Sequence, residues 1–285
     1  MAEPNAFTGV ALDRAHGLRG DPERLAAQHA HPAARAVVAG PDGVAVTGDD
    51  EPRLALRPLA EAAEALLLGL DEHGPVFAVE AGNSDGLLGL RDAAALLPQA
   101  DAGLAAYAAA LLNWHRHHGH CSLCGAPTAI AEGGLLRRCP ACGGEHHPRT
   151  DPVVIMLVTD GAERVLLGRQ PTWPKGRYSA LAGFVEPGES LEEAVAREVR
   201  EETGVKIGPP AYVSSQPWPF PSSLMLGFTA PWRDGEPATA DDELEDARWF
   251  TRAELEAAVA DDGPFGVPPR LAIARRLMER WLAER

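Results

Sequence analysis

The stretch that most constrains the fold is residues 183–205, which read GFVEPGESLEEAVAREVREETGV. Ser190 followed three residues later by Glu193 is a capping box, so we expect a helix to begin near Leu191. Gly204 supplies the left-handed residue that commonly ends such a helix. The sequence therefore predicts a loop, a helix and a second loop.

Three carboxylates lie on or beside the apolar face of this predicted helix. At about 100° per residue, Leu191 and Val195 mark the inward face, and Glu198, Glu201 and Glu202 project to the same side or its flank. A solvated acidic face is the simpler interpretation, but clustered and partly buried anions repel one another unless a cation joins them. Carboxylate oxygens suit Mg²⁺ or Mn²⁺, ions that usually bring substrate phosphates with them. The pattern predicts a divalent-metal site for a phosphate substrate.

The spacing of these residues also resembles a known family. The fixed positions of the Nudix box are all matched, by Gly183, Glu189, Arg197, Glu198, Glu201, Glu202 and Gly204, with Val199 and Val205 at its aliphatic positions. A motif of this kind still needs its structural context. The resemblance implies hydrolysis of a nucleoside diphosphate linked to another group.

Charge and length limit the classes of partner. The 285 residues include 41 acidic and 26 basic side chains, a net charge of −15 that disfavours general coating of nucleic acids or anionic membranes. We find no run of about 18 apolar residues and no signal peptide at the start, so we expect a cytoplasmic protein. The length suggests two domains, or one domain with a small insert.

Residues 1–112 are expected to form an N-terminal α+β domain. Strand-like runs separated by turn residues occur at 36–38, 44–46, 54–56 and 75–79. Helical patterns occur at 60–68, 87–97 and 103–114, whereas the first 30 residues are uninformative. Nothing in this domain predicts chemistry by itself.

Two Cys-x-x-Cys pairs follow, Cys121 with Cys124 and Cys139 with Cys142, each pair followed by glycine. This spacing indicates a four-thiolate zinc site, and a cytoplasmic location disfavours the alternative of disulfides. Four thiolates leave no position for water, so we expect a structural zinc ion in a ribbon over residues 113–148. A second site ligated by the nearby histidines is the weaker alternative.

Residues 149–285 are expected to form the domain that carries the box. The continuous apolar run 152–158 predicts a buried central strand, 164–169 a partner strand, and 270–281 a closing amphipathic helix. The resemblance implies the Nudix α/β/α sandwich with a mixed sheet. The whole chain is then an α+β protein with the ribbon between its two larger domains.

Residues 215–223 read SQPWPFPSS, and their prolines hold Trp218 and Phe220 on an extended backbone. Aromatic side chains held in this way suit stacking on a flat heterocycle, worth about 1–3 kcal/mol per base; filling the core is the alternative role. The stretch resembles the SQPWPFPxS signature of the NADH pyrophosphatase branch of the Nudix family. The resemblance implies that a dinucleotide such as NADH or NAD⁺ is bound by Gln216, Pro217, Trp218, Pro219, Phe220, Pro221, Ser222 and Ser223.

The resemblance also implies ligands for Mg²⁺ or Mn²⁺. These are the backbone carbonyl of Ala182 and the carboxylates of Glu198, Glu202 and Glu243, the last of which lies six residues before Trp249. Glu201 or Glu202 would accept a proton from the attacking water, and both assignments stay open. Arg197 would orient a carboxylate through its planar fork.

Three further substrate contacts are implied. Phe184 would stack against the nicotinamide, and Arg91 is the position that we assign to a basic residue by which relatives approach the substrate from the N-terminal domain. An ordinary residue at the end of a helix is the alternative for Arg91. Relatives place a tyrosine before the Pro-Arg that follows the ribbon, whereas here His147 takes that position, and an imidazole can still stack or hydrogen-bond. The relatives that this chain resembles also form homodimers, so the resemblance implies a homodimer here.

The predicted reaction is metal-dependent hydrolysis of NADH or NAD⁺ to nicotinamide mononucleotide and AMP. Two alternatives remain open. Removal of the NAD cap from RNA 5′ ends is disfavoured by the net charge of −15. A non-catalytic nucleotide sensor is disfavoured by the intact carboxylates of the box.

Overall fold

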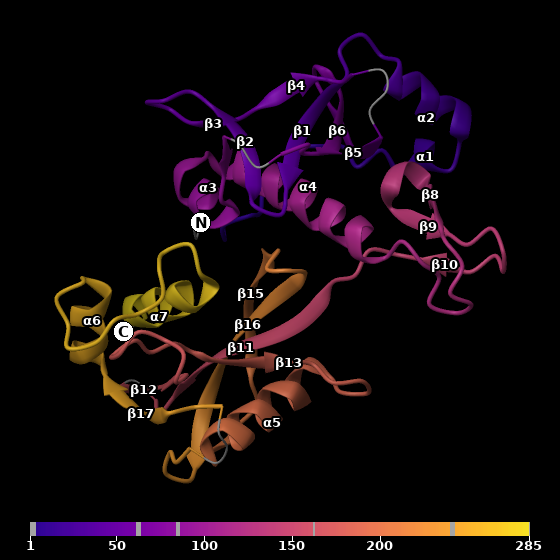
Figure 1. Cartoon of the computed structure of the whole chain (residues 1–285). Helices are drawn as coiled ribbons and strands as arrows, with labels where there is room; N and C mark the ends of the chain where they lie inside the picture. The colour runs from indigo at the N-terminus through magenta and orange to yellow at the C-terminus, as the bar shows by residue number, and fades with distance from the viewer. Residues whose placement is uncertain (1–3, 61–63, 84–85, 162, 240–242, 285) are drawn as a thin grey trace.

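The computed structural model describes residues 4–60, 64–83, 86–161, 163–239 and 243–284. Figure 1 shows an N-terminal body and a C-terminal body, each with helices packed on a sheet, and the ribbon beside the N-terminal one. Among the helices of these ranges, none combines the length and the apolar character needed to cross a membrane.

The N-terminal domain is built on one sheet. Its main path runs in the order β3 (Arg53–Leu54), β2 (Gly43–Thr47), β1 (Arg35–Gly40), β6 (Gly74–Glu80) and β5 (Ala65–Asp71), while β4 (Leu56–Pro58) pairs with β1 and β7 (Leu87–Leu88) with β2. The main core lies between this sheet and the helices α3 (Leu90–Leu96) and α4 (Gln99–His117). Helices α1 (His16–Arg19) and α2 (Pro22–His29) pack near the second, smaller cluster.

The helix predicted at 60–68 is wrong. Residues 65–68 belong to β5, which pairs antiparallel with β6, and 61–63 lie outside the described residues. Leucine and alanine favour helices, but Leu66, Leu67 and Leu68 are at most 3% exposed on the sheet, so tertiary burial overrides local propensity. The helical pattern at 87–97 likewise begins with the short strand β7.

The ribbon is a small three-stranded sheet in the order β10 (Glu145–His146), β9 (Leu136–Arg138) and β8 (Ala129–Ala131), with a 3-10 turn at Glu132–Gly134. It lies against β5. The buried Arg19 guanidinium joins the two, because it donates to the carbonyl of Glu132 at 3.3 Å and to that of Leu68 at 3.1 Å. The ribbon is therefore part of the N-terminal body rather than a separate appendage.

The C-terminal sheet runs in the order β14 (Lys206–Ile207), β16 (Ser223–Asp234), β11 (Asp151–Thr159), β12 (Arg164–Arg169) and β17 (Asp246–Thr251), with β13 (Leu181–Phe184) paired to β11 and β15 (Ala211–Trp218) to β16. Strands β11 and β16 are parallel and the other pairs are antiparallel, so the sheet is mixed.

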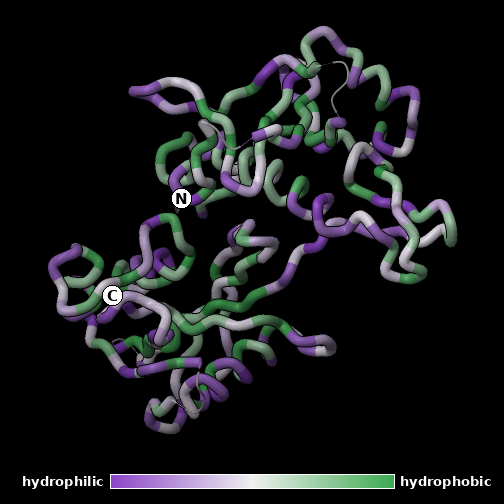
Figure 2. The backbone as a smooth tube through the Cα atoms, in the orientation of Figure 1, coloured by the Kyte–Doolittle hydropathy of each residue, from purple (hydrophilic) through white to green (hydrophobic). Residues whose placement is uncertain are grey.

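Helices cover both faces of this sheet. Helix α5 (Leu191–Thr203) packs on one face, and α6 (Arg252–Val259) and α7 (Ile273–Ala283) pack on the other. Figure 2 shows hydrophobic residues along the sheet and hydrophilic ones on the outer side of α5. The predicted α/β/α sandwich is confirmed, and α6 is an element that the sequence did not predict.

Residues 4–8, the N-terminal strap, join the two bodies. Phe7 is 1% exposed, and its ring centroid lies 6.1 Å from that of Trp218 and 5.9 Å from that of Phe220. The Asn5 side chain donates to the carbonyl of Ser215 at 2.7 Å, and Gln99 on α4 donates to the carbonyl of Asn5 at 2.6 Å. A segment that was uninformative in sequence thus packs against the signature residues Trp218 and Phe220.

Candidate active site

The box folds as its sequence predicts. The Ser190 hydroxyl accepts a hydrogen bond from the backbone N–H of Glu193 at 3.2 Å, and the Glu193 carboxylate accepts one from the backbone N–H of Ser190 at 2.8 Å. Gly204 ends α5 with a φ of 72°. The predicted capping box and left-handed end are both confirmed, and they fix where the carboxylates of the helix lie.

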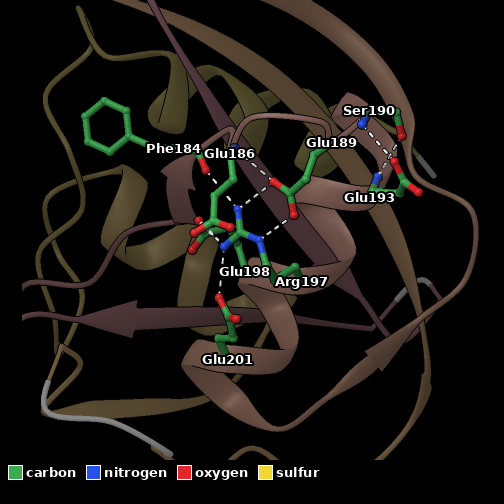
Figure 3. A network of polar contacts seen from close by, with 8 residues as sticks. All are labelled: Phe184, Glu186, Glu189, Ser190, Glu193, Arg197, Glu198 and Glu201. Atoms are coloured by element: carbon green, nitrogen blue, oxygen red, sulfur yellow. Dashed lines mark hydrogen bonds and ion pairs between the residues drawn. The ribbon is translucent and has the colours of Figure 1, made fainter.

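Arg197 is the centre of the carboxylate cluster (Figure 3). Its guanidinium donates two hydrogen bonds to Glu189, at 2.6 and 2.9 Å, and one each to Glu198 at 2.8 Å and Glu201 at 2.9 Å. It also donates to the backbone carbonyl of Phe184 at 2.9 Å. Arg197 therefore ties the loop before the helix to the helix and orients three carboxylates rather than the single one that we predicted.

The surroundings of the cluster shift the pKa values of two of its carboxylates in opposite directions. Hydrogen bonds from Arg197, and then one from the backbone N–H of Glu186, lower the pKa of Glu189 to about 2. Glu198 behaves oppositely, because burial raises its pKa and the negative charges of Glu201 and Glu243 raise it further, against the opposing effect of Arg197. In this cluster, Glu198 is therefore the carboxylate whose surroundings disfavour the negatively charged form.

Glu198 reaches its place because Gly183 has no side chain. A Cβ at position 183 would lie 1.9 Å from the carboxylate carbon of Glu198, far closer than any contact allows. The carboxylate thus rests directly on the backbone of β13, next to Ala182. Glycine at the first position of the box is required for this close approach rather than for a turn.

The three inward carboxylates predicted on α5 differ in burial. Glu202 is 2% exposed and the Glu198 side chain 12%, whereas the Glu201 side chain is 54% exposed. Glu243 is exposed, and it lies close enough for its charge to act on Glu198. These hard oxygen donors fit a divalent cation, since positive charge beside Glu198 and Glu202 would offset the cost of keeping them ionised in the interior.

A cavity of about 420 Å³ lies beside the signature, which forms a hairpin between β15 and β16. Aromatic, apolar and cationic side chains line it, including Arg91, Trp173, Arg177, Trp218 and Met225. The Arg91 guanidinium carbon lies 4.0 Å from the Phe220 ring centroid and 5.2 Å from that of Trp218. The structure thus brings Arg91, from the N-terminal domain, to both rings that the sequence predicts to bind substrate.

The eight signature residues do not face one space. They divide among three cavities: Gln216 and Trp218 line the cavity of about 420 Å³, Pro219, Phe220 and Pro221 line one of about 700 Å³, and Pro217, Trp218, Pro219, Ser222 and Ser223 line one of about 230 Å³. Residues 219–222 form the turn between the two strands, so the signature side chains spread around the tip of the hairpin and do not share one face. The predicted extended backbone turns at a cis Phe220–Pro221 peptide, which the sequence analysis missed.

Two of these polar residues are already engaged. The side-chain amide of Gln216 is fully buried, donates to the carbonyl of Leu271 at 2.7 Å and accepts from the backbone N–H of Ile273 at 2.8 Å. The Ser222 hydroxyl donates to Asp151 at 2.8 Å. Gln216 fixes the start of α7 against the sheet, so its contribution to the cavity is mainly one of shape.

Phe184 and His147 lie apart from this cavity. The Phe184 side chain is 59% exposed, and its ring points away from the Arg197 cluster (Figure 3). His147 is exposed in the segment between β10 and β11. The structure leaves both rings accessible to a ligand, and their predicted contacts with substrate remain predictions.

The four cysteines of the ribbon come together as a metal site requires. One sulfur atom from each lies within 4.8 Å of the others, and the Cys121–Cys142 and Cys124–Cys139 distances of 3.6 and 3.5 Å are too long for disulfides. Backbone N–H groups of Cys142 and Ala141 lower the pKa of Cys139 to about 7, whereas the three neighbouring thiols raise the pKa of Cys142 to about 12. A cation among the four sulfur atoms would favour the thiolate form of all of them.

Three family models match the chain. They are the NADH pyrophosphatase-like rudimentary NUDIX domain over residues 30–114, the NADH pyrophosphatase zinc ribbon domain over 116–146 and the NUDIX domain over 149–268. This chain belongs to the Nudix family. Its domain set is that of the NADH pyrophosphatase branch, which confirms the resemblance seen in the box, the ribbon and the signature.

Curated Nudix relatives are similar over part of their length. The chain is 50% identical to the NAD-capped RNA hydrolase NudC of Stutzerimonas stutzeri over 182 residues, 64% of this chain and 62% of that protein. It is 45% identical to NudC of Mycobacterium tuberculosis strain H37Ra over 202 residues, 68% and 64%. With the human NAD-capped RNA hydrolase NUDT12 it shares 46% identity over 198 residues, 65% and 43%. The match thus spans less than two thirds of each relative.

As a Nudix protein with this ribbon, the chain uses two kinds of metal: a divalent cation, Mg²⁺ or Mn²⁺, and a structural Zn²⁺. Sequence reasoning found the donor types of both. It missed Phe7, Trp173 and Arg177, because none stands in a motif and each reaches its place through tertiary contacts. The available signal was that Phe7 and Trp173 are large aromatic residues outside every predicted helix and strand.

Proposed function

We propose that this protein is a diphosphatase that hydrolyses the pyrophosphate bond of NADH or NAD⁺ to nicotinamide mononucleotide and AMP. The observation that carries the proposal is the position of Glu198. Its carboxylate is 12% exposed, rests on Gly183 and accepts a hydrogen bond from Arg197. The same domain carries the aromatic cavity that Arg91 completes. A protein that binds and hydrolyses a dinucleotide needs two parts, acidic donors and an aromatic cavity lined by cationic side chains.

The metal would be held by Glu198, Glu202, Glu243 and the carbonyl of Ala182. When bound, a divalent cation neutralises the non-bridging phosphoryl oxygens and lowers the pKa of a coordinated water. Arg197 holds Glu198 and Glu201 in fixed orientations through its planar fork. This preorganisation means that the carboxylates need not rearrange as charge develops on the diphosphate.

Carboxylates of α5 would take up the proton of the attacking water. Water oxygen bonds to one phosphorus as the bond from that phosphorus to the bridging oxygen breaks, and the bridging oxygen leaves with the other mononucleotide. Glu201 is accessible to solvent and Glu202 is buried, so Glu201 suits proton exchange with water and Glu202 suits the role of ligand. We therefore favour Glu201 as the base.

Substrate orientation would come from the signature rings. Trp218 lines the cavity and is held from behind by Phe7, while Arg91 contacts the rings of Trp218 and Phe220. Rigid aromatic walls favour stacking of a base. Phe184 and His147 would complete the binding surface for the nicotinamide nucleotide.

The remaining assignments support this function. We propose that Cys121, Cys124, Cys139 and Cys142 hold the structural zinc, and that residues 1–112, 113–148 and 149–285 are the working units of the chain. We also propose that the protein acts as a cytoplasmic homodimer. Sedimentation measurements would test the oligomeric state.

Removal of the NAD cap from RNA is a second proposed function, favoured by the names of the curated relatives. The same bond would be cut in both substrates. Hydrolysis of free NADH and of capped RNA at two salt concentrations separates them, because binding that depends on RNA phosphates falls steeply with salt. A similar weak salt dependence for both would show that the RNA body adds nothing.

A panel of dinucleotides and nucleoside diphosphate sugars, incubated with and without Mg²⁺ or Mn²⁺, tests the proposal. We expect metal-dependent release of AMP and nicotinamide mononucleotide from NADH or NAD⁺. Binding without any hydrolysis across the panel would instead favour a non-catalytic sensor. Product analysis identifies the bond that is cut.

A further inference from the structure

Arg169 is the last residue of β12 and is 6% exposed. Burying a guanidinium is costly unless acceptors surround it. The Nε and Nη2 atoms of Arg169 donate to the Glu245 carboxylate at 2.9 and 2.7 Å, and its Nη1 atom donates to the carbonyl of Pro174 at 2.8 Å. Glu245 precedes β17, whereas Pro174 lies in the loop between β12 and β13. One buried side chain thus joins two segments that are distant in sequence.

The segment before β17 is attached to β12 at two consecutive positions. The backbone N–H of Glu245 donates to the carbonyl of Arg169 at 2.9 Å. Leu244 is 6% exposed and packs on Gly168, where an added Cβ would lie 2.8 Å from the Leu244 Cδ1 atom. Glu243, the proposed metal ligand, comes directly before these anchored residues and is itself exposed. The position of Glu243 is therefore set through its two neighbours rather than by its own burial.

The loop between β12 and β13 forms one wall of the cavity of about 420 Å³, to which it contributes Trp173 and Arg177. The near end of the loop is held by Arg169, which donates to the carbonyl of Pro174 at 2.8 Å and to that of Trp173 at 3.4 Å. The far end is held separately, because the residue after Arg177 donates its N–H to the carbonyl of Gly266 at 2.9 Å. Arg169 therefore fixes the part of the loop on which the aromatic side chain lies.

We propose that Arg169 is a positioning residue shared by the divalent cation and the adenosine end of the substrate. The inference rests on the proposed dinucleotide function, in which the nicotinamide nucleotide is bound by Phe184 and His147, residues that do not line the cavity. The cavity therefore receives the adenine base. Through Glu245 the guanidinium holds the segment of Glu243, and through the loop after β12 it holds the aromatic wall. Its donors point in fixed directions, which the flexible ammonium of a lysine does not reproduce.

The test measures two binding reactions of the zinc-loaded protein without turnover. Binding of Mn²⁺ alone is followed by the electron paramagnetic resonance of the free ion, and binding of AMP without added divalent cation by calorimetry. Arg169→Met should weaken Mn²⁺ binding about tenfold, the typical cost of losing a group that holds a metal ligand in place, and AMP binding by a similar factor. Glu245→Gln removes only the carboxylate contact and should weaken Mn²⁺ binding alone. Arg169→Lys keeps a charge for Glu245 but loses donors to the loop, so it should weaken AMP binding more than Mn²⁺ binding.

Arg280→Met is the matched control, because it breaks an exposed ion pair with Glu284, at 3.0 Å, elsewhere in the same domain. It should leave both binding reactions unchanged. Thermal unfolding of every variant is measured in parallel. Equal weakening of Mn²⁺ and AMP in all three site variants, in step with the thermal midpoint, would make Arg169 a merely stabilising residue, and unchanged binding in Arg169→Met would remove it from the site; either result overturns the proposal. The expected binding pattern without hydrolysis of any dinucleotide would support the role of Arg169 and overturn the proposed function instead, so the two failures stay distinguishable.

Discussion

The two metal sites of this chain differ in how their ligands are assembled. The ribbon brings together four sulfur atoms from two short Cys-x-x-Cys pairs, all within 4.8 Å of one another. The box draws its proposed donors from β13, α5 and a distant position at Glu243, and the Arg197 guanidinium bridges Glu189, Glu198 and Glu201. The ribbon site is closed by its four cysteine ligands. In the box, the Arg197 guanidinium holds the carboxylates in place and the site stays open.

This difference follows from what each site must do. Four thiolates complete the coordination of zinc, so the metal contributes to the fold and nothing else can enter. The box must admit a diphosphate and water, so its carboxylates have to be kept ionised and separate before the substrate arrives. Changes in the ribbon should therefore affect stability first, and changes in the box should affect turnover first.

Cys139→Ser should have the largest effect. Zinc binding supplies about 10–16 kcal/mol in isolated zinc-finger peptides, and the ribbon lacks a large core of its own. Because the ribbon packs on β5 through Arg19, we expect loss of bound zinc and a clear fall in the thermal midpoint of the N-terminal body. Metal content and calorimetry measure both. Ser122→Ala, an exposed position in the other Cys-x-x-Cys pair, is the control. Full zinc content with an unchanged midpoint would contradict this assignment.

Glu202→Gln should have the next largest effect, on turnover rather than stability. A bound cation supplies several kcal/mol of transition-state stabilisation, so loss of a buried proposed ligand should lower kcat by about 10²-fold or more, with a smaller change in KM. Glu192→Gln, on the exposed face of the same helix, should behave as the wild type. Near-normal kcat at saturating Mg²⁺ would remove Glu202 from the site.

Gly183→Ala tests the close approach of Glu198 to β13. The new Cβ would lie 1.9 Å from the carboxylate carbon, so the carboxylate must move, and a displacement of about 1 Å can cost about 10²-fold in rate. Adding Glu198→Asp, which shortens the side chain, should recover part of the lost kcat. Gly82→Ala, where a Cβ meets open space, is the control. If the double variant is no better than Gly183→Ala, the clash is not the cause.

The features predicted well from sequence are those fixed by neighbours in the chain. Ser190, Glu193 and Gly204 set the ends of α5 by local hydrogen bonds and by a left-handed turn, and the four cysteines bring their own geometry. Each of these depends on residues a few positions away. The donor types of both metal sites could therefore be predicted before any packing was known.

The features that escaped prediction depend on distant contacts. The β5 strand takes its conformation from β6 despite helix-favouring residues, and Phe7 gains its meaning only beside Trp218. Arg177 stands in no motif, and only the C-terminal loop brings it to the cavity. Arg91 lies between the two classes, because the resemblance named the position and the fold supplied its aromatic contacts.

The smallest expected effect concerns the pH dependence of stability. The pKa of Glu189 is about 2 in the folded protein, below its ordinary value of 4.5, because Arg197 donates two hydrogen bonds to the carboxylate. The stabilisation is therefore complete above pH 4.5 and is lost as the pH falls from 4.5 towards 2. Glu189→Gln removes this contribution, so its unfolding free energy should fall less steeply than that of the wild type over this window. Acid also releases zinc from the ribbon, but it does so in both proteins, so the difference between their urea-unfolding curves isolates Glu189. Parallel curves would show that the Arg197 contacts orient the cluster without stabilising it.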